Sequence, residues 1–172
     1  TDAAGYCLIA TAKRDFVNLA VAASAAPAST AATAPRRLLS IVLGTASENA
    51  RASESQKLLN WGFTAFDAVK LFDANQPVAA PAVWKGKENT LKLGRAQAIV
   101  VAVPKGSADK LQTQVARPDP LVAPFAKGQA VGSLKVSLNG QPMVEVPLVA
   151  LEGVEQAGFL GRAWDAVRLW IK

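Results

Sequence analysis

The sequence predicts an α+β fold with two domains, the second of them all-β, and a terminal amphipathic helix. Three observations support this prediction. Two apolar, β-prone runs and a long stretch of helix-forming residues occupy residues 1–71. Residues 72–156 contain recurrent prolines and short apolar runs without a sustained helical period, which is typical of a small all-β sandwich. Residues 157–172 carry polar side chains at helical spacing, which indicates an amphipathic helix.

The composition predicts a globular chain and argues against several classes of site. Hydrophobic residues make up 51% and charged residues 19% of the 172 residues, which is ordinary for a chain that buries a core. The net charge of +6 favours anionic partners, but the basic residues are dispersed, so we do not expect nucleic-acid binding. With one cysteine and no histidine, we expect no internal disulfide, no metal and no cofactor. No signal peptide and no apolar run long enough to span a bilayer is present, which indicates a processed or partial chain that is not integral to a membrane.

The first two strands are predicted on either side of a low-complexity segment. Tyr6–Ala12 is a β-prone apolar run that ends at three charged residues, and Leu38–Leu43 is a second such run. We expect the two strands to be neighbours in one sheet. Between them, residues 22–35 consist mainly of Ala, Ser, Thr and Pro, a composition that predicts a mobile surface loop. Cys7 is predicted to be a small buried hydrophobic residue.

A long helix is predicted from Thr45 to about Lys70. Thr45 and Glu48 have the spacing of a capping box, and the residues that follow are rich in helix formers. Trp61 is predicted to be a core residue, and Gly62 to make a close contact with the sheet that offsets its cost of about 1 kcal/mol in a helix. The apolar side chains form two adjacent ridges that we expect to pack on the sheet: Leu59, Phe63 and Phe66, and Leu58, Trp61, Ala65 and Ala68.

The second domain is predicted to be entirely β. Asn139-Gly140 lies between two apolar runs, and this pair predicts a type I′ hairpin because both central residues of that turn need positive φ. The strand candidates are Val78–Trp84, Thr90–Leu93, Ile99–Val103, Leu111–Val115, Val131–Leu138 and Met143–Val149.

The tail is predicted to contact a membrane surface. Its polar residues recur at spacings of three, three and four, so they share one face of a helix, and two tryptophans lie on the broad apolar side. Indole rings at headgroup depth and basic side chains near lipid phosphates are typical of an interfacial helix. The residues expected to touch the membrane are Phe159, Arg162, Trp164, Arg168 and Trp170. The alternative is a terminal helix that docks on its own domain or on a partner.

Two segments resemble a known enzyme family. Residues 1–8 read Thr-Asp-Ala-Ala-Gly-Tyr-Cys-Leu, and residues 44–63 contain Glu-Ser-Gln-Lys-Leu-Leu-Asn-Trp-Gly-Phe. Both resemble the type-5 low-molecular-mass penicillin-binding proteins, which are serine D-alanyl-D-alanine carboxypeptidases. In that family the strand that carries a Lys-Thr-Gly box leads within a few residues into such a Thr-Asp-x-Ala-Gly-Tyr stretch. The likeness extends to residues 81–84, to residues 124–132 and to the tail. It implies that residues 1–71 are the terminal part of a penicillin-binding transpeptidase domain.

The resemblance implies an acyl-serine mechanism for the intact protein. A serine attacks the terminal D-Ala-D-Ala peptide bond of a peptidoglycan stem peptide, D-Ala leaves, and water hydrolyses the acyl-enzyme. Penicillins and other β-lactams acylate the same serine. We expect the family's S-x-x-K, S-x-N and K-T-G boxes to lie outside this chain, so no catalytic residue is assigned within it. The expected partners are the stem peptide, β-lactams, the N-terminal part of the same catalytic domain and the outer face of the bacterial inner membrane, which implies a periplasmic location.

One residue of this chain is a candidate for substrate binding. Arg51 matches a family arginine near the Lys-Thr-Gly strand and the C-terminal carboxylate of the substrate, a group that suits the fixed fork of guanidinium donors. The alternative is a solvated arginine that pairs with Glu48 or Glu54 at helix spacing. A second function is also open for the whole chain: a noncatalytic envelope module whose β domain binds a partner or a glycan and whose helix anchors it.

Overall fold

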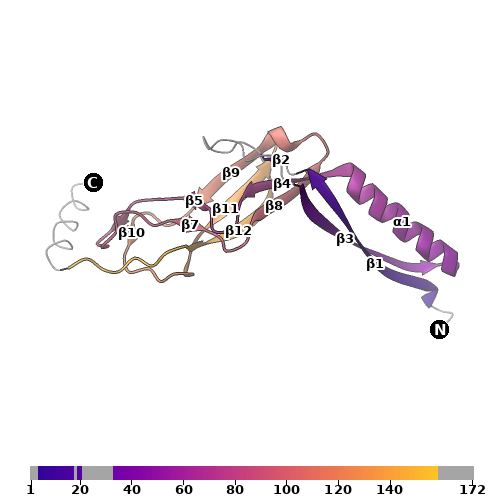
Figure 1. Ribbon diagram of the computed structural model, residues 1–172, viewed down its shortest axis with the longest axis horizontal. Coiled ribbons are helices and arrows are strands. Elements are labelled where there is room, and N and C mark those ends of the chain that lie inside the picture. The colour runs from indigo at the N-terminus through magenta and orange to yellow at the C-terminus, as the bar shows by residue number, and fades with distance from the viewer. Residues whose placement is uncertain (1–3, 18, 21–32, 159–172) are drawn as a thin grey trace. The chain divides into compact units, whose positions relative to one another are not determined.

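The computed structural model describes residues 4–17, 19–20 and 33–158, which form mostly β-strands and one α-helix (Figure 1). The chain divides into two compact units. The first comprises Thr1–Lys70 and Val100–Asp109, and the second comprises Leu71–Ile99 and Lys110–Lys172. Within the described ranges, no helix is both long enough and apolar enough to cross a membrane.

The first unit is built on a long antiparallel hairpin. Strand β1 (Tyr6–Val17) pairs with β3 (Thr33–Thr45), and the register runs from Tyr6 opposite Thr45 to Val17 opposite Thr33. The prediction that these two runs are neighbouring strands is confirmed. Both strands are longer than predicted. The prediction ended the first strand at Ala12 because three charged residues follow, but pairing continues through residues 13–15 and on to Val17.

Helix α1 (Glu48–Ala65) is shorter than predicted and begins at a different cap. Ser47 is the N-cap, and its hydroxyl accepts a hydrogen bond from the amide of Ala50 at 3.1 Å. The predicted cap at Thr45 is wrong, because Thr45 ends β3 and its hydroxyl donates to the carbonyl of Tyr6 at 2.9 Å. At Phe66 the backbone becomes extended, so the predicted continuation to Lys70 is also wrong.

Helix α1 covers one face of the hairpin, as Figure 1 shows. Ser40 and Val42 of β3 and Ser55 of α1 are buried there. The predicted close contact of Gly62 is confirmed, because a Cβ at this position would lie 2.8 Å from Cδ1 of Leu38 in β3. Trp61 is 60% exposed, so the prediction that it is a core residue is wrong: its ring packs edge-on against Phe66, with 5.3 Å between the centroids.

A second sheet follows the helix. Strand β4 (Phe66–Phe72) lies between β2 (Leu19–Ala20) and β8 (Ile99–Pro104). The amide of Lys105 donates to the carbonyl of Ala65 at 2.9 Å. These partners are remote in sequence, which explains why local propensity assigned this segment to the helix.

The second unit contains a five-stranded sheet. Its strands lie in the order β5 (Pro77–Ala79), β7 (Leu93–Gly94), β12 (Gln141–Ala150), β11 (Ala130–Leu138) and β9 (Leu111–Ala116), while β6 (Val83–Trp84) and β10 (Leu121–Val122) form a parallel pair. The η2 turn (Ala108–Lys110) precedes β9. The strands predicted for β9, β11 and β12 are confirmed. The single strand predicted over Val78–Trp84 is wrong, because it is two short strands, β5 and β6.

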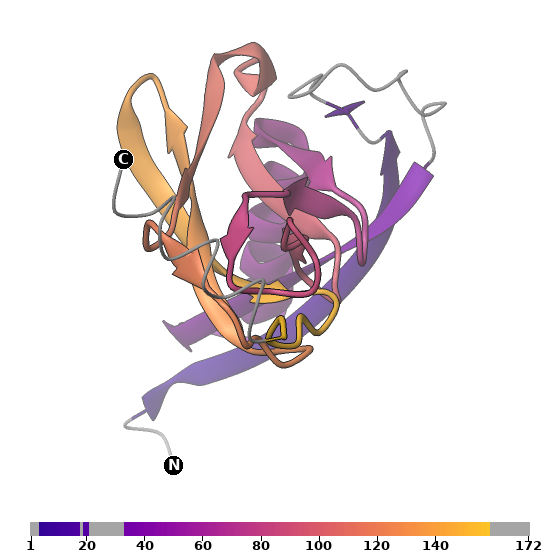
Figure 2. The same ribbon diagram turned by 90° about the vertical axis from the view of Figure 1, so that its left-hand side faces the viewer.

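The turn between β11 and β12 has the predicted conformation (orange in Figure 2). Asn139 and Gly140 have φ of 52° and 78°, the positive values that a type I′ turn requires. The second unit buries its own core, and its most enclosed side chains include Leu91, Leu93, Leu134 and Leu148. This unit therefore has the apolar interior of a domain.

Candidate functional site

Two glycines lie close together at the end of the β1–β3 hairpin where β1 begins and β3 ends. Gly5 and Gly44 both have positive φ, and a Cβ on Gly5 would lie 2.9 Å from Cα of Gly44, so a side chain at Gly5 would clash with the backbone. The ladder is irregular between Tyr6 and Leu8. This local geometry brings the start of β1, the end of β3 and the first turns of α1 together.

Arg51 of α1 lies at this end of the hairpin. Its Nη2 donates to Oε1 of Glu48 at 2.8 Å, and its Nη1 donates to the carbonyl of Cys7 at 3.4 Å. Its guanidinium carbon is 5.8 Å from the centroid of the Tyr6 ring, within reach of a cation–π contact. The side chain is 31% exposed, so it is held beside β1 while part of its fork of donors still faces solvent. Sequence reasoning did not identify the contact with Tyr6.

Arg51 was interpreted either as a substrate-binding residue or as a surface arginine that pairs with Glu48 or Glu54. The structure contains the pair with Glu48, and this pair is compatible with substrate binding. The Arg51–Glu48 pair joins residues three apart on an exposed helix face, an arrangement that contributes little to stability. Glu54, the other predicted partner, pairs instead with Lys57. A partly exposed guanidinium whose carboxylate partner is itself exposed has the chemistry to bind a different carboxylate.

The face of the hairpin opposite α1 carries exposed apolar side chains. We call Ile9, Leu39, Ile41 and Leu43 the open face. Their exposed fractions range from 55% at Ile41 to 71% at Leu43, and Ile9 lies directly opposite Ile41 in the ladder. Cys7 is also exposed, so its predicted burial is wrong for this chain. Strands that are apolar on both faces are typical of sheets covered on both sides, and this signal was present in the two runs.

The outer edges of the hairpin are also free in the part of the chain that the structure describes, where β1 and β3 form a two-stranded sheet. A groove of about 420 Å³ opens beside β3 in the first unit. It is mostly apolar and includes Leu39 and Ile41 of β3 together with Leu58 and Trp61 of α1. The open face and the groove therefore expose apolar side chains of this unit to water, and the strand edges expose unpaired backbone polar groups.

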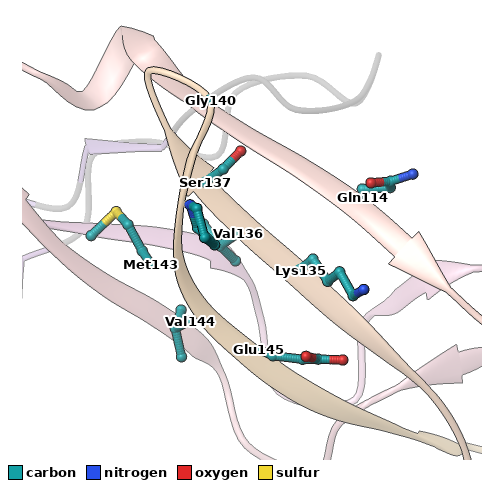
Figure 3. A pocket seen from close by; sticks show the side chains of 9 residues that line it. Gln114, Lys135, Val136, Ser137, Gly140, Met143, Val144 and Glu145 are labelled. Atoms are coloured by element: carbon teal, nitrogen blue, oxygen red, sulfur yellow. The ribbon is translucent and has the colours of Figure 1, made fainter.

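The second unit has a hollow of its own, of about 440 Å³ (Figure 3). It lies on β9, β11 and β12, and Figure 3 shows Met143 apart from Gln114 and Lys135. Ser133 donates a hydrogen bond to Glu145 at its margin. The hollow mixes polar and apolar side chains: Gln114, Lys135, Val136, Ser137, Gly140, Pro142, Met143, Val144 and Glu145.

We expected the family's three catalytic boxes to lie outside this chain, but the residue spacing of two of them does occur within it. No K-T-G is present, but Ser107-Ala108-Asp109-Lys110 has the S-x-x-K spacing, and Ser47-Glu48-Asn49 and Ser137-Leu138-Asn139 have the S-x-N spacing. Ser47 caps α1, Ser107 lies in a turn and Ser137 lies in β11. An activated serine needs a base within hydrogen-bond reach, and among the described residues neither Ser107 nor Ser137 has a side-chain partner for its hydroxyl. These matches do not form a catalytic site.

Two further predictions concern a metal site and the membrane contacts. Across residues 4–17, 19–20 and 33–158, no group of three or more His, Cys, Asp or Glu side chains is arranged to hold a metal ion. The predicted membrane contacts lie outside the described residues: Phe159, Arg162, Trp164, Arg168 and Trp170.

Comparison with known proteins gives one family and a consistent group of relatives. Residues 66–156 match the family model described as penicillin-binding protein 5, C-terminal domain. The D-alanyl-D-alanine carboxypeptidase DacC of Escherichia coli K12 is 38% identical over 134 residues, covering 77% of this chain and 34% of the relative. DacA of the same strain is 30% identical over 170 residues, covering 98% and 38%. The chain therefore spans about a third of the length of the curated relatives it matches.

Solved structures agree with this result. Penicillin-binding protein 5 from Haemophilus influenzae superposes with a TM-score of 0.66 at 31% identity, covering 70% of this chain and 35% of that one. The D-alanyl-D-alanine carboxypeptidase DacD from Francisella tularensis superposes with a TM-score of 0.55 at 31% identity, covering 91% and 35%.

Proposed function

The chain belongs to the family of the penicillin-binding protein 5 C-terminal domain, and we propose that it is the C-terminal third of a periplasmic serine D-alanyl-D-alanine carboxypeptidase. The relatives carry that activity in their names, and each is about three times as long as the part that this chain matches. In this proposal the catalytic serine belongs to the rest of the intact protein. The present chain supplies one flank of the catalytic domain and the β domain that the family model matches.

The observation that carries the proposal is the open face of the β1–β3 hairpin. A sheet with α1 on one side and exposed Ile9, Leu39, Ile41 and Leu43 on the other leaves much apolar surface in water. Burying such surface is worth about 25 cal/mol per Å², so the hairpin favours a second covering layer. The family model is described as a C-terminal domain. In this proposal the extra length of the relatives therefore lies mainly on the amino-terminal side, and that part supplies the covering layer.

The proposed reaction is the removal of the terminal D-Ala from peptidoglycan stem peptides. The serine oxygen bonds to the carbonyl carbon of the penultimate D-Ala, the terminal D-Ala leaves with a proton on its nitrogen, and water then hydrolyses the ester to regenerate the serine. A penicillin would follow the first step with its lactam ring and remain attached. These steps are assigned to the intact enzyme.

Arg51 is the residue of this chain that we propose contacts the substrate. Its guanidinium lies between Tyr6 and Glu48 at the end of the hairpin where β1 begins. In the family, the Lys-Thr-Gly box precedes this start by a few residues. The C-terminal carboxylate of a stem peptide would displace Glu48 and form charge-assisted hydrogen bonds with the fork of donors.

The location of the intact protein is also part of the proposal. The tail sequence supports a peripheral anchor on the outer face of the inner membrane, where the β domain would hold the catalytic domain above the bilayer. Truncation before Phe159 is expected to release the protein from anionic vesicles. Retained binding after truncation would show that a different segment anchors it.

A noncatalytic envelope module remains the second candidate. The hollow at Lys135, Met143 and Glu145 favours it, because a β domain with a mixed polar and apolar hollow can bind a partner or a glycan.

Labelling the full-length protein with a fluorescent penicillin distinguishes the carboxypeptidase from the noncatalytic envelope module. We expect a covalent adduct that survives denaturation, together with release of D-Ala from a D-Ala-D-Ala peptide. A sample boiled before labelling is the control. A native full-length protein that is not labelled contradicts the carboxypeptidase proposal.

A further inference from the structure

Four cations occupy two consecutive cross-strand pairs of the hairpin. Lys13 lies opposite Arg37, and Arg14 lies opposite Arg36. Like charges directly opposite each other destabilise a sheet unless another group compensates them. The two pairs therefore each need an explanation.

The Arg14–Arg36 pair is compensated by the end of helix α1. Arg36 donates to the carbonyls of Phe66 at 2.8 Å and Gly62 at 3.1 Å, and Arg14 donates to Oδ1 of Asn60 at 2.7 Å. The guanidinium carbons of both arginines lie within 5.2 Å of the centroid of the Phe63 ring. Cations are stabilised at a helix C-terminus, where carbonyl groups lack intrahelical partners.

The Lys13–Arg37 pair faces the other way. Successive side chains of a strand point to opposite faces, and both residues are exposed. Among the described residues, neither side chain makes a hydrogen bond or an ion pair. One acidic residue, Asp15, lies two positions further along the same face, and it too has no ion pair with a described residue.

Lys13 and Arg37 lie on the same side of the hairpin as the open face, and they adjoin one end of its row of apolar side chains. The pairs Ile9–Ile41, Thr11–Leu39 and Lys13–Arg37 follow one another at two-residue steps. A surface that is apolar along most of its length and doubly cationic at one end fits a polypeptide layer that is apolar along its length and acidic at the matching end.

We propose that the part of the full-length protein that precedes the hairpin covers the open face and presents one or more carboxylates to Lys13 and Arg37. This inference rests on the proposed function for the existence of that part, and it adds the chemistry of the contact. Arg37 suits a bidentate carboxylate and Lys13 adds a second charge, and the pair is partly shielded from water once the layer is in place. A free anion would satisfy the two cations but would leave the adjoining apolar row in water.

Zero-length cross-linking of the full-length protein with a carbodiimide tests the contact. The reagent joins an amine to a carboxylate in an amide bond with loss of water, and mass spectrometry of the digest identifies the partners. We expect a cross-link from Lys13 to an Asp or Glu that precedes Thr1, and its loss in Lys13→Arg. The exposed Lys87–Glu155 pair is the internal control, because its two side chains are hydrogen-bonded. If Lys87–Glu155 cross-links while Lys13 joins only Asp15, or nothing, the proposal is wrong.

A charge reversal gives a second test with opposite signs for the two cases. In an uncovered hairpin, Lys13→Glu would place a carboxylate opposite Arg37 and raise the thermal midpoint. Against a covering layer with carboxylates, the same change creates repulsion and lowers the midpoint, and salt reduces the loss. We expect a loss larger than that of the neutral Lys13→Met, and a raised or unchanged midpoint overturns the proposal.

Penicillin labelling of the same preparation keeps the two proposals separate. A labelled protein without the Lys13 cross-link retains the carboxypeptidase proposal and rejects the acidic contact. An unlabelled protein with the cross-link rejects the activity and retains the contact.

Discussion

The β1–β3 hairpin and the five-stranded sheet of the second unit differ in where their apolar side chains lie. In the sheet, Leu93 and Leu148 are completely buried, and the exposed positions of β12 alternate with buried ones near its end. In the hairpin, Ile9 and Leu43 are among the most exposed large residues described. The second unit, to which the sheet belongs, buries its own apolar core, whereas the hairpin has one covered face and one uncovered face. The amount of β-structure in a segment therefore says less about independence than the number of faces that it buries.

The largest expected effect is in the core of the second unit. Leu148→Ala removes a fully buried side chain of β12, and we expect a loss of about 3–5 kcal/mol in the free energy of unfolding of this unit. Chemical denaturation of the full-length protein, followed by tryptophan fluorescence and circular dichroism, measures the loss. A cost below about 1 kcal/mol would contradict the interpretation of this unit as a domain with its own core.

The sharpest test of the comparison uses two residues that are both exposed in this chain. Ile41 on the open face is 55% exposed and Met143 of β12 is 41% exposed. If the open face is covered in the full-length protein, Ile41→Ala should cost about 2–3 kcal/mol there, while Met143→Ala should cost less than about 0.5 kcal/mol. Equal and small costs in the same denaturation experiment would mean that the open face stays in water.

A kinetic test concerns the end of the hairpin. Arg51→Ala should lower kcat/KM for a D-Ala-D-Ala peptide by about tenfold to a hundredfold, the equivalent of one charged hydrogen-bonding group. Arg51→Lys should retain part of the activity, and Glu48→Gln, which removes the competing carboxylate, should not reduce it. An Arg51→Ala enzyme with wild-type kcat/KM would leave Arg51 as a surface residue that pairs with Glu48.

The smallest expected effect is a pH dependence at the surface of the second unit. The hydrogen bond and the positive charge of Lys87 lower the pKa of Glu155, and Glu155 in turn raises the pKa of Lys87. A lowered carboxyl pKa stabilises the fold above the unfolded pKa of about 4.3, and this stabilisation is lost as the pH falls through the folded pKa. The difference in thermal midpoint between the parent protein and Glu155→Gln should be small at neutral pH and vanish in acid. A difference that grows in acid would contradict the assignment.

Local sequence patterns predicted the elements whose stabilising contacts are local. Asn139-Gly140 fixes its own turn, and the alternating runs on either side form β11 and β12 as predicted. The pairing of β1 with β3 was also predicted, since two β-prone apolar runs in the same part of the chain are most simply neighbours in one sheet.

The errors occur where distant partners decide the structure. Residues Phe66–Phe72 are a strand because β2 and β8 pair with them, and no helix-forming score contains that information. Lys13 and Arg14 continue β1 because Arg14 reaches α1, whereas charged residues in isolation indicate a strand end. Cys7 and Trp61 were assigned to a core by residue type, although both lie on surfaces that this chain leaves open.

The position of the cysteine has a practical consequence. Cys7 is the single thiol of this chain, and it lies in β1, exposed, next to the contact between Arg51 and Tyr6. If the preceding polypeptide covers this strand during biogenesis, the sulfur passes from exposed to shielded at that moment. The rate at which Cys7 is alkylated in nascent and in mature protein would then report when the strand becomes covered, without any engineered label.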